Sequence, residues 1–272
     1  MEARLQRRIQ RYGWDKAADA YEVSWREQIA PSQQRLLELA DLRPGESVLD
    51  VACGTGLVTF PAARAVGSGG EVVGTDISEA MVQAAAQRAA ELGLTNASFQ
   101  RMDAEELRFQ EESFDAALCG LGLMYVPDPL AAMRGQLRVL RRGGRAVSAV
   151  WGARRKCGWA EIFPIVDARV RTEVCPLFFQ LGTGDAQETV FEMAGFTNVR
   201  SARISTLMRY ETAEEACGAA FAGGPVALAH SRFDEGTRAE AHAEYTASIA
   251  PYKNGNGYEI PGEFVITVGY KA

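Results

Sequence analysis

Histidine, paired cysteine, positive charge and long apolar runs are all scarce in this sequence. Its 272 residues include two histidines and five cysteines, and no two cysteines form a C-x-x-C pair. A disulfide framework is therefore not expected, and no metal site is predicted. The formal net charge of −6 is opposite to the basic footprint that nucleic acid requires, so no nucleic-acid partner is predicted.

A signal segment and a membrane span are not expected either. The first residues, Met1–Trp14, alternate in charge and have no apolar core. The longest uncharged run, Ala216–Ala229, is rich in glycine and shorter than the ~20 apolar residues that cross a bilayer. The unpaired cysteines suit a reducing compartment, so we expect a cytoplasmic protein without integral membrane association.

Strand-like and helix-like segments alternate between residues 46 and 151, as is typical of parallel βαβ units. The predicted strands are Ser47–Val51, Glu71–Thr75, Ala97–Arg101, Asp115–Cys119 and Arg145–Val150. Ser78 and Asp128 are candidate N-caps of two intervening helices, and the second of these helices is expected to end at Gly143. The core is therefore predicted to be α/β.

The chain is expected to be a single domain of three parts. Residues 1–45 are predicted to form a helical lid, residues 46–151 the ligand-binding core, and residues 152–272 the elements on the acceptor side. The β-branched, alternating end of the chain predicts a final strand. Residues 210–256, which precede it, are interpreted as a helical insertion.

The stretch VLDVACGTG, Val48–Gly56, runs as an apolar strand into a turn with two glycines. Such turns bind dinucleotides, phosphates or S-adenosylmethionine. The dinucleotide fingerprint fails at Thr59, and no Gly-Lys-Ser/Thr sequence follows for a phosphate loop. Asp76 ends the second predicted strand about 20 residues after Gly56, where an acidic side chain can bind ribose hydroxyls. Asp103, after the third strand, could accept a hydrogen bond from an adenine amino group.

In order and spacing, these features resemble a class I S-adenosylmethionine-dependent methyltransferase of the ubiquinone/menaquinone-biosynthesis type, similar to methyltransferase domains 11 and 25. The resemblance covers residues 12–151 and rests on five motifs: Val48–Gly56, Asp76, Asp103-Ala104, LCGLGLMYVPDP from Leu118 and RVLRRGGRAVSAVW from Arg138. It implies a Rossmann-like, doubly wound, seven-stranded sheet. The sheet would be mostly parallel with an antiparallel last strand, a helical N-terminal lid and a helical insertion before that strand.

The resemblance also implies S-adenosyl-L-methionine as the cofactor. The cofactor-binding residues it implies are Tyr21, Asp50, Ala52, Gly54, Thr55, Gly56, Asp76, Ile77, Met81, Asp103, Ala104 and Leu121. Purely structural roles compete at two of them, because Asp50 could brace the turn and Asp103 could begin a helix. Gly120 stands where many relatives have glutamine, a departure expected to leave local room.

The predicted reaction is methyl transfer to a small-molecule acceptor, of enzyme class EC 2.1.1, by in-line displacement that depends mainly on proximity and orientation. Trp159, Phe163 and the pair Phe178-Phe179 favour an apolar or aromatic acceptor. The sequence assigns no catalytic residue. His230 and His242, in the predicted insertion, are weak candidates for a general base.

Other functions stay open at this point. The chain could be a non-catalytic partner or sensor that binds S-adenosylmethionine, and a nicotinamide dehydrogenase is disfavoured by Thr59. The sequence leaves undetermined which acceptor is used and whether oxygen, nitrogen, sulfur or carbon is methylated. A homodimer is also an open alternative.

Overall fold

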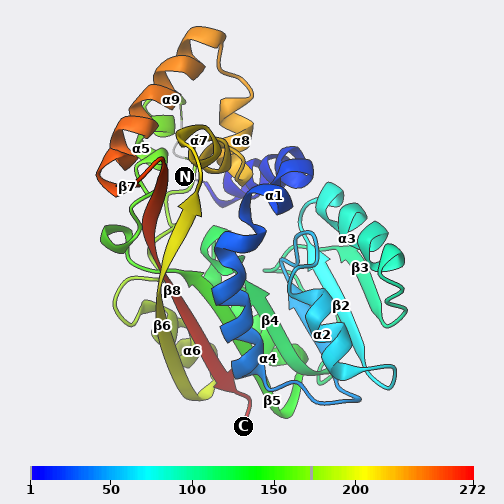
Figure 1. The fold of residues 1–272 in the computed structure, drawn as a ribbon. Helices are drawn as coiled ribbons and strands as arrows, with labels where there is room; N and C mark the ends of the chain where they lie inside the picture. Colours follow the sequence, from blue (N-terminus) through cyan, green and yellow to red (C-terminus); the bar gives the residue numbers. More distant parts are fainter. Residues whose placement is uncertain (1, 172–173) are drawn as a thin grey trace.

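The computed structural model describes residues 2–171 and 174–272, which are arranged around one central sheet (Figure 1). The strands are β1 (Ser47–Val51), β2 (Glu71–Asp76), β3 (Ala97–Arg101), β4 (Phe114–Gly120), β5 (Leu140–Trp151), β6 (Thr197–Tyr210), β7 (Lys253–Asn254) and β8 (Gly257–Tyr270). The helices are α1 (Ala3–Ala40), α2 (Thr59–Val66), α3 (Glu79–Glu91), α4 (Pro129–Val139), α5 (Ile162–Asp167), α6 (Ala186–Ala194), α7 (Ala213–Phe221), α8 (Gly224–His230) and α9 (Glu235–Ile249), with 3-10 turns η1 (Leu123–Tyr125), η2 (Arg154–Lys156) and η3 (Ala250–Tyr252).

The strand order is β3-β2-β1-β4-β5-β8-β6, with the short β7 paired to β8. Strands β1 to β5 are parallel, and β8 runs antiparallel to both of its long neighbours. The predicted Rossmann-like fold is therefore confirmed. The chain order of the strands reverses between β1 and β4, and open α/β sheets bind ligands beyond the strand ends at such a switch point.

The predicted core strands are confirmed with small shifts of their ends, and one helix boundary was wrong. Helix α4 begins after its cap Asp128, whose Oδ1 accepts a hydrogen bond from the Ala131 amide at 2.9 Å, but it ends at Val139 rather than Gly143. Strand β5 already begins at Leu140. Gly143 lies in its irregular first part, with φ +76°, and donates its amide to the Lys271 carbonyl at 2.9 Å.

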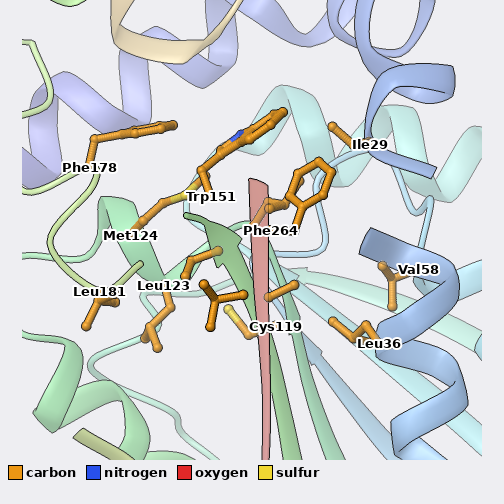
Figure 2. Packing of buried hydrophobic residues seen from close by; sticks show 14 of the residues in the cluster. Ile29, Leu36, Val58, Cys119, Leu123, Met124, Trp151, Phe178, Leu181 and Phe264 are labelled. Carbon is orange, nitrogen blue, oxygen red and sulfur yellow. The ribbon is translucent and has the colours of Figure 1, made fainter. Parts of the chain in front are cut away.

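Helix α1 is a single helix of 38 residues that continues through Pro31, and its C-terminal part runs along the sheet (Figure 1). Ile29 and Leu36 are buried in the cluster that also holds Val58 (Figure 2). Arg145 of β5 anchors the end of α1, because its guanidinium donates to the Ala40 and Asp41 carbonyls and pairs with Glu46.

Helices α7, α8 and α9 follow β6 and gather with α5 beyond one end of the sheet (Figure 1). Helix α8 packs tightly on α1, since a Cβ added to Gly13 would lie 2.6 Å from the Gly224 carbonyl carbon. These contacts place α1 between the sheet and the last helices. Within the described residues, no helix is long and apolar enough to cross a membrane.

The segments that follow β1 and β4 approach each other so closely that Gly122, two residues after β4, is expected to tolerate no side chain. A Cβ added to Gly122 would lie 2.4 Å from the Ala52 Cβ. We therefore expect Gly122→Ala to lower the free energy of unfolding by about 1–3 kcal/mol through overpacking. Urea denaturation of the wild type and of Gly122→Ala measures this difference in the free energy of unfolding. Gly218→Ala is the control, because Gly218 lies in helix α7 with open space around it, and alanine there should be neutral or stabilising by up to about 1 kcal/mol.

Candidate active site

A cavity opens at the switch point, and we name it the glycine-turn cavity after the turn that follows β1. Its wall comes from this turn, from the residues after β2, β3 and β4, and from helix α1. Of the predicted cofactor residues it contains Tyr21, Asp50, Ala52, Gly54, Thr55, Asp76, Ile77, Met81, Asp103, Ala104 and Leu121. Gly56 is not in this wall. Its φ is +91°, and an added Cβ would lie 2.4 Å from the Phe60 ring, so Gly56 serves helix packing.

Asp76, at the end of β2, links the glycine turn to the start of helix α3. Its Oδ2 accepts the Gly54 amide and its Oδ1 accepts the Ser78 amide, both at 2.9 Å. Burial raises the pKa of Asp76 to about 6, although hydrogen bonds from the Ser78, Gly54 and Ile77 amides oppose the rise and the charge of Asp15 adds to it. The Asp76 carboxylate also belongs to the wall of the glycine-turn cavity, so it faces a bound ligand.

Asp50, in β1, is fully buried beside the turn. Its Oδ2 accepts a hydrogen bond from the Thr59 hydroxyl at 2.6 Å, whereas its Oδ1 has no partner among the described residues. Burial raises the pKa of Asp50 to about 7; the Thr59 bond opposes the rise and the charge of Asp76 adds to it. The Thr55 hydroxyl, in the same wall, is also buried and unpaired in the described structure. Asp50 therefore braces the turn with one oxygen and leaves the other available.

Two residues other than glycine adopt left-handed backbone angles in the cavity wall. Ala52, after β1, has φ +56°, and Leu121, after β4, has φ +62°. Such angles cost on the order of 1–3 kcal/mol and concentrate at binding and catalytic sites. Gly120 also belongs to the wall, but an added Cβ would lie 2.9 Å from Val58 Cγ2, so the expected local room is filled by valine.

Helix α1 closes the cavity with residues that the sequence analysis did not assign to the cofactor. Arg7, Gln10 and Trp14 line it together with Tyr21. Their spacing of three, four and seven residues puts them on one helix face, and this periodicity could have identified them. Asp15 holds the helix in place, because its Oδ1 accepts the Ser78 hydroxyl at 2.6 Å and the Ala80 amide at 3.3 Å.

Asp103 begins a turn, not a helix, after β3. Its Oδ1 accepts the Glu105 amide at 3.0 Å, and its Oδ2 lies 3.2 Å from Arg7 Nε. Arg7 also pairs with the Glu105 carboxylate. The carboxylate of Asp103 therefore already has a cationic partner, which a ligand amino group would have to share.

A second cavity, the aromatic cavity, adjoins the first. Trp14, Tyr21, Leu121 and Tyr125 belong to both walls. The rest of its wall includes Trp25, Trp151, Trp159, Phe163, Cys175 and Phe178. Within the described part of the chain this wall contains no aspartate, glutamate, lysine, arginine or histidine.

Three side chains of the aromatic cavity can ionise, and none is a base at neutral pH. Burial raises the pKa of Tyr21, and the charge of Asp76 adds to the rise. Burial likewise raises the pKa values of Tyr125 and Cys175 above their ordinary range. All three therefore stay protonated near pH 7.

His230 and His242 do not line either cavity. Their Nε2 atoms lie 2.9 Å apart, and both rings pack on Phe221 with centroids 4.6 Å away. Burial lowers the pKa of His230 to about 4, helped by His242 and Arg238. The pair is neutral at pH 7 and connects α8 to α9, so the structure gives it no contact with the site. Among the described residues, no group of three or more His, Cys, Asp or Glu side chains could hold a metal ion.

The fold and the glycine-turn cavity define an α/β protein that binds a ligand at the switch point of a doubly wound sheet. Residues 42–160 match a family model described as a methyltransferase domain.

Three comparisons with known proteins agree with this match. The chain is 43% identical to nocamycin O-methyltransferase from Saccharothrix syringae over 48% of its own length and 47% of that protein. It is 30% identical to demethylmenaquinone methyltransferase from Bacillus cytotoxicus over 55% of its length and 65% of that protein. The fold of the YcgJ protein from Bacillus subtilis is similar, with a TM-score of 0.60 at 18% identity over 89% and 98% of the two chains. The chain thus spans between about half and two thirds of the curated relatives it matches.

The raised pKa of Asp50 predicts that the protein becomes less stable as pH rises. Because its folded-state pKa of about 7 exceeds the ordinary aspartate value of 3.8, the folded state binds the proton more tightly between these values, and stability is lost as pH rises through them. From pH 5 to 7.5 this loss should be about 2–3 kcal/mol. Urea denaturation at both pH values should show a smaller decline for Asp50→Asn than for the wild type. An equal loss of unfolding free energy in the wild type and in Asp50→Asn would contradict the raised pKa of Asp50.

Proposed function

We propose that this protein transfers a methyl group from S-adenosylmethionine to a small molecule that is apolar or aromatic. One observation carries the proposal: Trp14, Tyr21, Leu121 and Tyr125 are wall residues of both cavities. A ligand in the glycine-turn cavity would end beside a ligand in the aromatic cavity, as group transfer requires. The relatives named as methyltransferases of nocamycin and demethylmenaquinone support it.

The residues of the glycine-turn cavity suit this cofactor. The Asp76 carboxylate in the cavity wall can accept from the ribose hydroxyls, and Ile77 and Met81 offer apolar surface for the adenine. The unpaired Oδ1 of Asp50 can accept from the ammonium of the methionine part. Gly54 leaves open space where a Cβ would stand, so that the backbone can lie against the ligand.

Bound S-adenosylmethionine supplies an electrophilic methyl group on a sulfonium. The protein's part is to hold two ligands in line and to exclude water, and orientation of this kind is worth about 7–11 kcal/mol. Tyr21, Tyr125 and Cys175 remain neutral, so they shape the cavity and take no proton. The proposed mechanism has no protein base.

We further propose that the enzyme belongs to class EC 2.1.1 and works in a reducing cytoplasm. All five cysteines are unpaired, which supports a reducing compartment. A homodimer stays a proposal that sedimentation can test.

Turnover separates this function from that of a cofactor-binding sensor. The protein is incubated with isotope-labelled S-adenosylmethionine and a panel of phenols, quinols, amines and thiols, and products are analysed by mass spectrometry. Methylated product supports the proposal. Binding of S-adenosylhomocysteine without transfer to any acceptor would instead favour a non-catalytic partner or sensor.

The assignment of Asp76 to the ribose predicts the effect of one substitution. Asp76→Asn removes the charge and one acceptor oxygen, so the affinity for S-adenosylhomocysteine should fall by about 10–100-fold, as expected for charge-assisted hydrogen bonds of about 1.5–3 kcal/mol. Isothermal titration calorimetry measures the change. Asp128→Asn is the matched control, because Asp128 only caps α4 and asparagine caps helices equally well. Equal affinities of Asp76→Asn and Asp128→Asn for S-adenosylhomocysteine would show that Asp76 does not bind the ribose.

A further inference from the structure

The N-terminal half of helix α1 carries a row of exposed side chains, three of them cationic, which we call the cationic row. It consists of Arg4, Arg8, Tyr12 and Lys16, and all four are exposed. Residues four apart lie above one another on a helix face, so the row runs along α1 for about 18 Å. None of its three cations forms an ion pair with the described residues. The charge of the row is therefore available to a partner.

The sign of this charge is opposite to that of the protein as a whole. Residues 3–16 contain five of the 29 lysines and arginines but one of the 35 aspartates and glutamates, whereas the net charge of the chain is −6. That one carboxylate, Asp15, is turned to the start of helix α3, where its Oδ1 accepts the Ser78 hydroxyl at 2.6 Å and the Ala80 amide at 3.3 Å. A cationic segment on an acidic protein indicates an anionic partner.

Apolar side chains in and beside the cationic row favour a lipid surface over a nucleic acid. Tyr12 is 49% exposed. Leu5 and Ile9, on the neighbouring row of the helix, are partly exposed, and in the described structure neither packs against the buried hydrophobic cluster. Nucleic-acid phosphates would pair with the cations but gain nothing from leucine and isoleucine. A helix in a bilayer interface pairs its cations with anionic headgroups and buries such apolar side chains at the boundary with the acyl chains.

Helix α1 separates the cationic row from the two cavities. Arg7, Trp14 and Tyr21 line the glycine-turn cavity, and the last two also line the aromatic cavity. At 3.6 residues per turn, the mean direction of these three side chains differs from that of the row by about 140°. This part of α1 lies between α8 and α3 beyond one end of the sheet (Figure 1). A helix is about 10–12 Å across, so a surface bound at the row would lie close to both cavities.

We propose that the cationic row docks the protein on a bilayer surface that contains anionic phospholipids. In this arrangement the three cations contact the headgroups, and Leu5, Ile9 and Tyr12 lie at the level of the headgroup boundary. The inference goes beyond the proposed function, since it concerns an interaction and no chemical step. A protein docked in this way would hold its uncharged aromatic cavity near a phase in which apolar molecules concentrate.

The experiment measures binding to vesicles by co-sedimentation. Vesicles of phosphatidylcholine alone are compared with vesicles that also contain about 30% phosphatidylglycerol, and the wild type should bind the anionic vesicles but not the neutral ones. The triple variant Arg4→Gln/Arg8→Gln/Lys16→Gln should bind the anionic vesicles about a hundredfold more weakly. Raising the salt concentration from about 0.05 M to about 0.3 M should weaken wild-type binding about tenfold, because exposed charges are screened.

A matched control removes the same charge elsewhere. Arg64, Arg134 and Arg142 are exposed, lie on α2, α4 and β5, and form no ion pair with the described residues. The variant Arg64→Gln/Arg134→Gln/Arg142→Gln should therefore bind anionic vesicles within about twofold of the wild type. In contrast, Tyr12→Ser should weaken binding about fivefold at low and high salt alike, because the contribution of the ring is not electrostatic. Circular dichroism records that each variant is folded.

Several results would overturn the inference. They are equal binding of the wild type to neutral and anionic vesicles, absence of binding to both, and equal losses in the two triple variants. Displacement from vesicles by millimolar inorganic phosphate would show a site for the free anion instead of a surface. Tighter binding to a short DNA duplex through the same three cations would point to nucleic acid. The comparison of lipids and salt needs no substitution, and the assay needs no methyl transfer, so a failure of the proposed function is recorded separately.

Discussion

The two hydrogen bonds that Asp76 accepts are the constraint on which the rest of the site depends. They tie the amide of Gly54, in the turn after β1, and the amide of Ser78, at the start of α3, to one carboxylate. The same Ser78 hydroxyl caps α3 and donates to Asp15 of α1. Three segments of the chain therefore take their positions from Asp76 and Ser78, and together these segments shape the cavity.

The second constraint on the site is backbone strain after β1 and β4. Ala52 and Leu121 hold left-handed angles at the ends of neighbouring parallel strands, where the Ala52 Cβ fills the space that a side chain at Gly122 would need. The sheet around them stabilises these angles, because Asp50 and Leu118 are paired in register and buried. The backbone of the switch point is thus held in a rare conformation by the regular strands behind it, an arrangement that leaves little freedom for the turn.

The core and the glycine turn could be predicted because local signals set them: strand periodicity, caps at Ser78 and Asp128, and an acidic residue at a fixed distance from the turn. What escaped prediction depends on contacts between distant segments. Gly56 looks equivalent to Gly54 in the sequence, yet only at Gly56 would an added Cβ collide with the Phe60 ring. Arg7 and Gln10 line the cavity because α1 is one long helix whose N-terminal part reaches the glycine-turn cavity. The pairing of His230 with His242 likewise follows from how α8 meets α9.

Charge balance explains why the glycine-turn cavity suits one adenosine ligand better than another. Its wall carries Asp50, Asp76 and Asp103, and its arginine, Arg7, is already paired with Asp103 and Glu105. A dinucleotide would place a pyrophosphate beside this negative charge, whereas a sulfonium with an ammonium group would be attracted to it. At an effective dielectric of about 20, a charge pair 4 Å apart is worth about 4 kcal/mol. Burial raises the pKa values of Asp50 and Asp76, and a cationic ligand beside them would favour their charged forms.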